Sequence, residues 1–421
     1  MPFLYGLDFG TSNSALSIYD TENEELLTTI RIPSLLYFTE AQEPGQGLKF
    51  TVGEEAVNRY LEEGMKGRFM KSVKRILPRR SFTETKVYTK RMTASDLVAL
   101  IIKELKQRAD AITGEEVQRV VLGRPVHFDD DDSELDALAQ DRLLRAAKQA
   151  GFTDIVLQYE PIAAAFTYER TLTQKERVLV GDLGGGTTDF TIIDLDPARH
   201  NTTNRQSDIL ATGGIYIGGD NFDSEFMWKR GTPHFGYGVQ YESMPGKFLD
   251  LPLSYFNNIC SWEKMNFFNS FKVRNEISRL YPRTAYNQRI KNLMTLIDHN
   301  LGYKLFQRIE QVKIDLSTEA NTRFAFKDFD ISINEAITQE AYAGIISRDV
   351  QRIEIYLDKF LAEHQVDAKQ IDTVFLTGGT SLVNSIQQLF KRKFPNSTIN
   401  SGDNFISVSK GLAYSGYLFN S

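Results

Sequence analysis

The sequence predicts an α/β fold of two lobes, and three observations support this prediction. Apolar runs typical of buried strands alternate with amphipathic helical segments along the chain. A strand–glycine–strand pattern occurs twice, ending its first strand at Asp8 and again at Asp182, 174 positions later, which indicates a duplicated architecture. Finally, 421 residues are too many for one simple hydrophobic core.

The two repeated patterns are predicted to be β-hairpins. In the first, an apolar run from Leu4 ends at Asp8, and glycine and hydroxyl residues precede an alternating run at 15–19. In the second, Val178–Phe190, the strand ends at Asp182, and three glycines and two threonines lead to Asp189. Glycine amides can form a concave anion site, but the flanking carboxylates would repel a naked phosphate, so we expect phosphate bound together with Mg²⁺. A glycine-rich turn without a ligand is the alternative for either hairpin alone.

The remainder of the first lobe is predicted from caps and periodicity. The pattern Thr-x-x-Asp from Thr93 is typical of a capping box that begins a helix. Strands are expected at 119–123 and 152–157, with a helix from Ser133 to Ala150 between them, and an alanine-rich helix follows Glu160 and Pro161. A basic cluster precedes them, for which a solvated face is the commoner explanation: Lys71, Lys74, Arg75, Arg79 and Arg80.

In the second lobe, a glycine-rich stretch at 211–223 leads into a helix, and an aromatic, mostly helical segment follows to about residue 300. Helices are then predicted at 300–317, 339–364, 381–393 and 408–419, and a buried strand at 373–377. We place the first lobe at 1–174, with an accessory subdomain at about 31–95 and residues 401–421 returning to it. The second lobe is placed at 175–400, with an accessory subdomain at about 224–309.

Composition excludes several classes of protein. The net charge of −6 gives no electrostatic reason to expect nucleic acid as a partner. No apolar run approaches the roughly eighteen residues of a membrane span, and the N-terminus lacks the basic region of a signal peptide. Cys260 is the only cysteine, which excludes an internal disulfide and fits a reducing compartment. We therefore expect a cytoplasmic protein.

Five motifs occur in the order in which they are found in one family: Asp8–Asn13, Tyr159–Pro161, Asp182–Thr187, Gly218–Asp223 and Leu376–Gly379. Over essentially its whole length the chain resembles the DnaK-type 70-kDa heat shock chaperones, whose ATPase domain belongs to the actin/hexokinase/heat-shock superfamily. Within that family it is most similar to short, single-domain YegD-type proteins. The resemblance implies an actin-like ATPase fold in which each lobe has a ribonuclease H-like mixed sheet.

The resemblance also implies roles for individual residues. Phosphates would be bound by Gly10, Thr11, Ser12, Asn13, Gly184, Gly185, Gly186 and Thr187. Asp8 and Asp182 would hold Mg²⁺, largely through water, and the catalytic set would be Lys74, Glu160, Asp182, Thr187 and Asp189, with Lys71 as the fallback for the lysine. The nucleoside would be contacted by Gly218, Gly219, Glu310, Lys313, Gly378 and Gly379, and the base by Ile314 and Leu382.

Three features depart from the family pattern. Arginines that stack on adenine in the family are replaced by Ile314 and Leu382, a loss of about 0.5–2 kcal/mol per side. The segment from about 224 to 309 is longer than in DnaK and is not similar to it. We also expect no β-sandwich peptide-binding domain after residue 421, so peptide binding of the DnaK type is not expected.

From the residues and the resemblance we expect a slow ATPase, a nucleotide-driven hinge whose cofactors are ATP or ADP and Mg²⁺, with K⁺ as a further candidate ion. The expected partners are a nucleotide and a protein client or co-chaperone, with neither nucleic acid nor membrane, and we expect a monomer. Two alternatives remain open: a nucleotide-binding interaction module that barely hydrolyses ATP, and an actin-like assembly protein.

Overall fold

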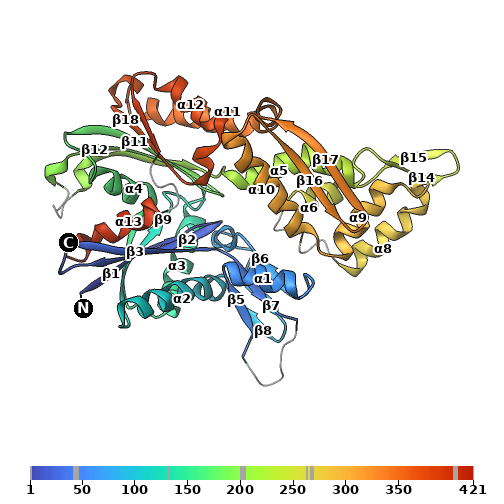
Figure 1. The fold of residues 1–421 in the computed structure, drawn as a ribbon, viewed down its shortest axis with the longest axis horizontal. Coiled ribbons are helices and arrows are strands. Elements are labelled where there is room, and N and C mark those ends of the chain that lie inside the picture. The colour runs from blue at the N-terminus through green and yellow to red at the C-terminus, as the bar shows by residue number, and fades with distance from the viewer. Residues whose placement is uncertain are drawn as a thin grey trace.

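The computed structural model describes residues 2–40, 47–129, 132–199, 205–261, 264–265, 270–401 and 406–420. In these residues two five-stranded mixed sheets lie one above the other, and smaller accessory elements extend from both toward the same side (Figure 1). We call the part built on the sheet that contains β1 the first lobe, and the part built on the sheet that contains β11 the second lobe. The mixed α/β fold predicted from the sequence is confirmed.

The first sheet has the strand order β10-β9-β1-β2-β3. The bounds of its strands are β1 (Phe3–Phe9), β2 (Asn13–Asp20), β3 (Glu25–Pro33), β9 (Arg119–Arg124) and β10 (Asp154–Tyr159). β1, β2 and β3 are antiparallel, whereas β9 is parallel to both β1 and β10. Side chains alternate across this sheet, so Tyr5 and Leu7 face a core with α2 (Ala94–Thr113) and α3 (Ser133–Gln149), while Leu4 faces the other side.

The second sheet has the order β13-β12-β11-β18-β19. Read from β19 to β13, its strands correspond one by one to β10-β9-β1-β2-β3 of the first sheet. Its strands are β11 (Glu176–Leu183), β12 (Thr188–Leu195), β13 (Ile209–Ile215), β18 (Thr373–Thr377) and β19 (Thr398–Ser401). Again three antiparallel strands adjoin two parallel ones. The duplicated architecture expected from the two hairpins is therefore present. α11 (Gln339–Glu363) and α12 (Asn384–Lys393) cover its outer face.

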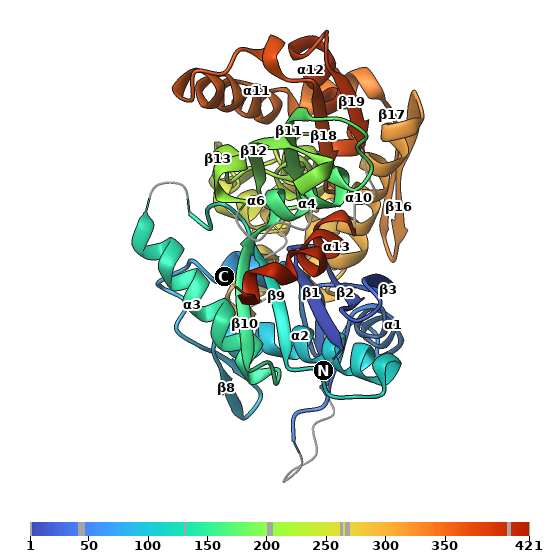
Figure 2. The same ribbon diagram turned by 90° about the vertical axis from the view of Figure 1, so that its left-hand side faces the viewer.

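Two helices lie between the sheets, as Figure 2 shows: α4 (Glu160–Glu169) and α13 (Ser407–Tyr414), which continues as a 3₁₀ turn at Ser415–Asn420. Their apolar side chains share one core with both sheets. The approach is close, because a Cβ on Gly411 would lie 1.6 Å from the carbonyl oxygen of Ala163, and Ser409 hydrogen-bonds Ser17 of β2 at 2.9 Å. α13 thus packs on the first lobe, while the exact lobe boundaries stay a prediction.

The accessory elements of the first lobe are β4 (Leu36–Phe38), β5 (Phe50–Val52), α1 (Glu54–Glu62), β6 (Arg68–Met70), the 3₁₀ turn η1 (Val73–Ile76), β7 (Thr85–Val87) and β8 (Lys90–Met92). Those of the second are α5 (Gly219–Phe226), η4 (Met227–Gly231), η5 (Thr232–Phe235), β14 (Gln240–Met244), β15 (Lys247–Asp250), α6 (Leu253–Ile259), α8 (Phe271–Leu280), α9 (Gln288–Asp298), α10 (Gly302–Thr318), β16 (Asn321–Asp328) and β17 (Ile331–Thr338). None of the helices in the described ranges has the length and apolar character that crossing a bilayer demands.

Candidate functional site

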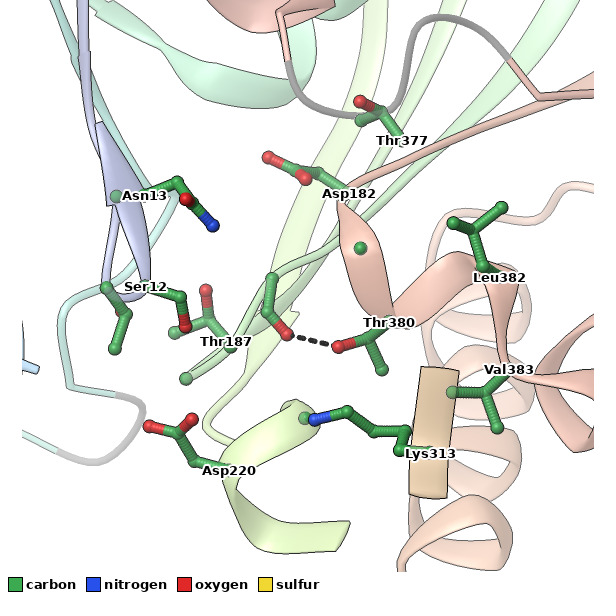
Figure 3. A pocket seen from close by; sticks show the side chains of 18 of the residues that line it. Ser12, Asn13, Asp182, Thr187, Asp220, Lys313, Thr377, Thr380, Leu382 and Val383 are labelled. Atoms are coloured by element: carbon green, nitrogen blue, oxygen red, sulfur yellow. Dashed lines mark hydrogen bonds between the residues drawn. The ribbon is translucent and has the colours of Figure 1, made fainter. Parts of the chain in front are cut away.

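A cleft of about 500 Å³ lies where the two lobes meet, and the turns of both predicted hairpins line it. Figure 3 shows Ser12 and Asn13 on one side of it, with Asp182 and Thr187 facing them and Lys313, Leu382 and Val383 farther along. This volume is in the range of small-molecule sites. Because the residues that line the cleft range from Asp8 to Val408, its walls come from segments far apart in the sequence.

The first turn is held rigid by serine side chains. Ser34, the residue after β3, donates from Oγ to the Gly10 carbonyl at 2.8 Å, and its backbone N–H donates to the Ser12 carbonyl at 2.9 Å. Ser34 Oγ also lies 2.8 Å from Ser14 Oγ, inside the protein. The side chains of residues 11–13 line the cleft, and Asn13 Oδ1 also accepts hydrogen bonds from the Arg31 guanidinium at 3.3 and 3.4 Å. The turn thus presents two hydroxyls and an amide to a ligand.

The second turn is tight and fits closely against the first. The Gly184 N–H donates to the Thr187 carbonyl at 2.9 Å, and Thr380 Oγ1 donates to the Gly184 carbonyl at 2.7 Å, the dashed line in Figure 3. A Cβ on Gly185 would lie 2.5 Å from Ser12 Oγ, and one on Gly186 would lie 3.1 Å from Thr11 Oγ1. A side chain at Gly185 or Gly186 would therefore press against the hydroxyl residues of the opposite hairpin.

At the end of the cleft formed by the two turns, carboxylates outnumber cations. Lys74 Nζ lies 2.7 Å from Glu160 Oε1, and both side chains are buried. Burial, together with Glu160 and Asp189, raises the pKa of Asp182 to about 8, although Lys74 opposes the shift. Burial and Glu160 similarly raise the pKa of Asp189 to about 7, and burial, Glu160 and Asp182 hold that of Asp8 well above its usual range. One lysine thus faces four acidic side chains.

The cation of Lys74 is nevertheless stable in this position. Burial alone would lower its pKa, but Glu160 and Asp8 outweigh burial, and the pKa is raised. Lys71 lies one turn earlier and pairs instead with Glu310 Oε2 at 3.5 Å. Of the two lysines, only Lys74 lines the cleft.

The opposite end of the cleft is apolar with a few hydroxyls. Ile314 of α10 is 54% exposed and lines the cleft with Leu382, Val383 and Gln387. Lys313 of the same helix points back to Asp223 Oδ2 at 2.8 Å and is held by it. Gly378 directly follows β18 and has φ of 79°, and a Cβ there would lie 2.2 Å from the Leu183 carbonyl oxygen, so only glycine fits.

Comparison with known proteins identifies this arrangement. The family model described as "Hsp70 protein" matches residues 4–229 and 287–418. The chain belongs to the Hsp70 family. A curated relative, "Chaperone protein DnaK" of Mycoplasmopsis synoviae (strain 53), is 24% identical over 97% of this chain. The chain spans 57% of that relative's length. The predicted family and its two-lobed, actin-like ATPase fold are therefore confirmed.

Most residues that the Hsp70 resemblance singled out come together in this one cleft. It is lined by Asp8, Gly10, Thr11, Ser12, Asn13, Lys74, Glu160, Asp182, Gly184, Gly185, Gly186, Thr187, Gly219, Glu310, Lys313, Ile314, Gly378, Gly379 and Leu382. Gly218 and Asp189 do not line it. Gly218 is buried at the N-terminus of α5, where a Cβ would lie 2.6 Å from Gly185. Asp189 is buried beside Asp182, its cross-strand pair, and its Oδ1 accepts the Val126 N–H at 3.2 Å.

Sequence reasoning had named no role for several residues that line the cleft: Asp220, Ser317, Thr318, Thr377, Thr380, Val383, Gln387 and Val408. Asp220 stood within the quoted motif Gly218–Asp223, and this was the signal that could have identified it. Thr377 likewise stood within the motif Leu376–Gly379. The other hydroxyl residues carry no such signal, because serine and threonine occur on most helix ends and loops.

The donor set fits Mg²⁺ better than a metal held by protein alone. No group of three or more acidic, histidine or cysteine side chains suited to hold a metal occurs among the described residues. Mg²⁺ commonly uses one or two carboxylates and completes its shell with water and phosphate. Two carboxylates of this kind, Asp8 and Asp182, line the cleft, and the buried Oδ2 of Asp189 close by has no hydrogen-bond partner among the described residues.

Proposed function

We propose that this Hsp70-family chain binds ATP with Mg²⁺ in the cleft between its lobes and hydrolyses it to ADP and phosphate, as a nucleotide-driven hinge. The observation that carries the proposal is that two glycine- or hydroxyl-rich turns face each other across a cluster of carboxylates with one lysine. A divalent cation would offset the negative charge of that end and allow a phosphate chain to approach the carboxylates. The apolar end, about Ile314 and Leu382, would receive the base.

Phosphoryl transfer to water needs positioning and charge neutralisation more than covalent chemistry. Bound Mg²⁺ would supply that neutralisation, with Asp8 and Asp182 as the residues that hold it. The amides of the glycine turn and the hydroxyls of Thr11 and Ser12 would bind phosphate oxygens, and Lys74 would contact the transferred group. Glu160, which accepts a hydrogen bond from Lys74, would orient the attacking water.

The test is single-turnover phosphate release by three variants: Asp8→Asn, Lys74→Ala and Glu160→Gln. Each should lose roughly 10²-fold in rate, by analogy with the loss of one transition-state contact. Arg80→Gln is a matched control, because Arg80 belongs to the same basic cluster but its side chain is 65% exposed and pairs with Glu134. Wild-type rates in all three cleft variants would overturn the assignment.

A second candidate, a nucleotide-dependent interaction module that hydrolyses slowly, is favoured by one observation. Residues 230–286 lie outside the family match and expose large apolar side chains, among them Met244 (65%), Phe248 (58%) and Leu253 (59%). Such residues are typical of a docking surface. Calorimetry with ATP and ADP beside a sensitive hydrolysis assay separates the two functions, since binding without turnover supports the module.

A further inference from the structure

Asp220, the second residue of α5, contacts both lobes at the phosphate end of the cleft. Its backbone N–H donates to the Gly185 carbonyl at 2.8 Å, so it holds the glycine turn of the second lobe. Its Oδ2 accepts a hydrogen bond from Ser72 Oγ at 3.2 Å and lies 3.7 Å from an Arg75 guanidinium nitrogen. Figure 3 shows this carboxylate directed toward the cleft. One residue thus joins the glycine turn to a segment of the other lobe.

That segment carries Lys74. Ser72 lies just before η1, a turn of four residues, and Arg75 lies within it, so the two residues flank Lys74. Ser72 has φ of 58°, a left-handed conformation that is uncommon outside glycine and persists where surrounding contacts fix it. Arg75 also lies over the ring of Tyr216, 5.4 Å from its centroid, and Tyr216 follows β13 of the second lobe. Residues on both sides of Lys74 are therefore held by the second lobe.

The partners of Lys74 itself define what Asp220 adds. Glu160, in the first lobe, fixes the ammonium group within that lobe. Nothing in that pair sets the distance between Lys74 and the glycine turn across the cleft, whereas the contacts of Asp220 join those two segments directly. Lys71 also pairs with the second lobe, through Glu310 of α10 at 3.5 Å, but Glu310 is not part of the glycine turn.

We propose that Asp220 is a positioning residue for hydrolysis: by holding Ser72 and Arg75, it brings Lys74 into register with the glycine turn only when the lobes are closed. The inference rests on the proposed function and concerns how its site is assembled. A misplacement of about 1 Å can cost roughly 100-fold in rate. Asp220 would therefore couple hinge closure to the chemical step without reacting itself.

The first test compares the rate of single-turnover ATP hydrolysis with the Kd for ATP in Asp220→Ala. We expect the rate to fall roughly 10- to 100-fold, the usual effect of losing a hydrogen bond to a charged group, while Kd changes much less. Asp328→Ala is the matched control, because it breaks an ion pair of 2.8 Å with Lys304 that lies within the second lobe. Equal changes in rate and Kd, or a rate within twofold of wild type, would overturn the proposal.

Two further measurements separate positioning from general damage. In a double-mutant cycle, the effects of Arg75→Ala and Asp220→Ala on the rate should be strongly non-additive, and additive effects would refute the shared contact. Spin labels on Glu55→Cys in α1 and Phe329→Cys, both exposed, report the distance between the lobes without hydrolysis. Asp220→Ala should broaden this distance distribution, and an unchanged distribution counts against a role of Asp220 in holding the two lobes together. A wild-type protein that does not hydrolyse ATP would refute the proposed function but leave this distance test valid.

Discussion

The buried pair of Lys74 and Glu160 gives a prediction about stability that needs no nucleotide. The exposed fractions of the two side chains are 9% and 7%, and the atoms are 2.7 Å apart. Replacing Lys74 with methionine leaves four acidic side chains without their cation. Removal of one partner from a buried pair costs about 3–5 kcal/mol, because the remaining charge stays desolvated. In the presence of a chelator, we expect Lys74→Met to lower the free energy of unfolding by that amount.

The measurement is the midpoint of urea-induced unfolding, compared across a set of variants. Lys74→Met combined with Glu160→Gln should recover part of the loss, since the uncompensated charge is removed. Arg177→Met is the matched control, because Arg177 also lies 2.7 Å from its partner, Asp194, but the two side chains are 32% and 47% exposed. An exposed pair contributes about 0–1 kcal/mol. The reasoning fails if Lys74→Met costs no more than the control, or if the double variant recovers nothing.

Two other predictions concern packing and the base. Gly411→Ala should lower the free energy of unfolding by about 1–3 kcal/mol, because its Cβ would lie 1.6 Å from the Ala163 carbonyl oxygen. Gly344→Ala in α11 has open space around its Cβ and should slightly stabilise the protein. Thermal unfolding distinguishes these opposite signs, and equal effects of the two variants would contradict the close packing at Gly411. Ile314→Arg should tighten ATP binding about 2- to 30-fold by restoring a cation–π contact of about 0.5–2 kcal/mol. Calorimetry compares its affinity for ATP with that of Ile314→Gln, and no gain over the glutamine variant would place the base elsewhere.

The sequence predicted those parts of the fold whose signals are local. Both hairpins followed from a strand that ends in aspartate, and the helix after Thr93 followed from its capping box, which the structure contains. The hairpin of β16 and β17 was missed, although its side chains alternate between exposed and buried as a half-solvated ribbon requires. Its strands are amphipathic but lack the glycine or Asn-Gly turn that marks a hairpin most strongly.

The candidate site divides in the same way. Residues in glycine-rich or strand-end motifs could be recognised, because such motifs are rare enough to be specific. The contact of Ser72 with Asp220 could not, since it joins residues 148 positions apart and depends on how the lobes meet. Nor could the burial of Asp189 outside the cleft be predicted, because the hairpin pattern gives the pairing of Asp182 with Asp189 but not what covers each side chain.

The two ends of the cleft depend differently on the arrangement of the lobes. Its apolar end is formed by Ile314 of α10 and by Leu382, Val383 and Gln387, all of which belong to the second lobe. Its charged end needs both lobes, because the Ser12 turn and Lys74 belong to the first lobe and the glycine turn to the second. A rotation about α4 and α13, the helices between the sheets, would therefore separate the groups of the charged end while leaving the apolar end intact. The chemistry proposed here is thus the part of the site most sensitive to lobe closure, and this sensitivity is what a hinge-type switch requires.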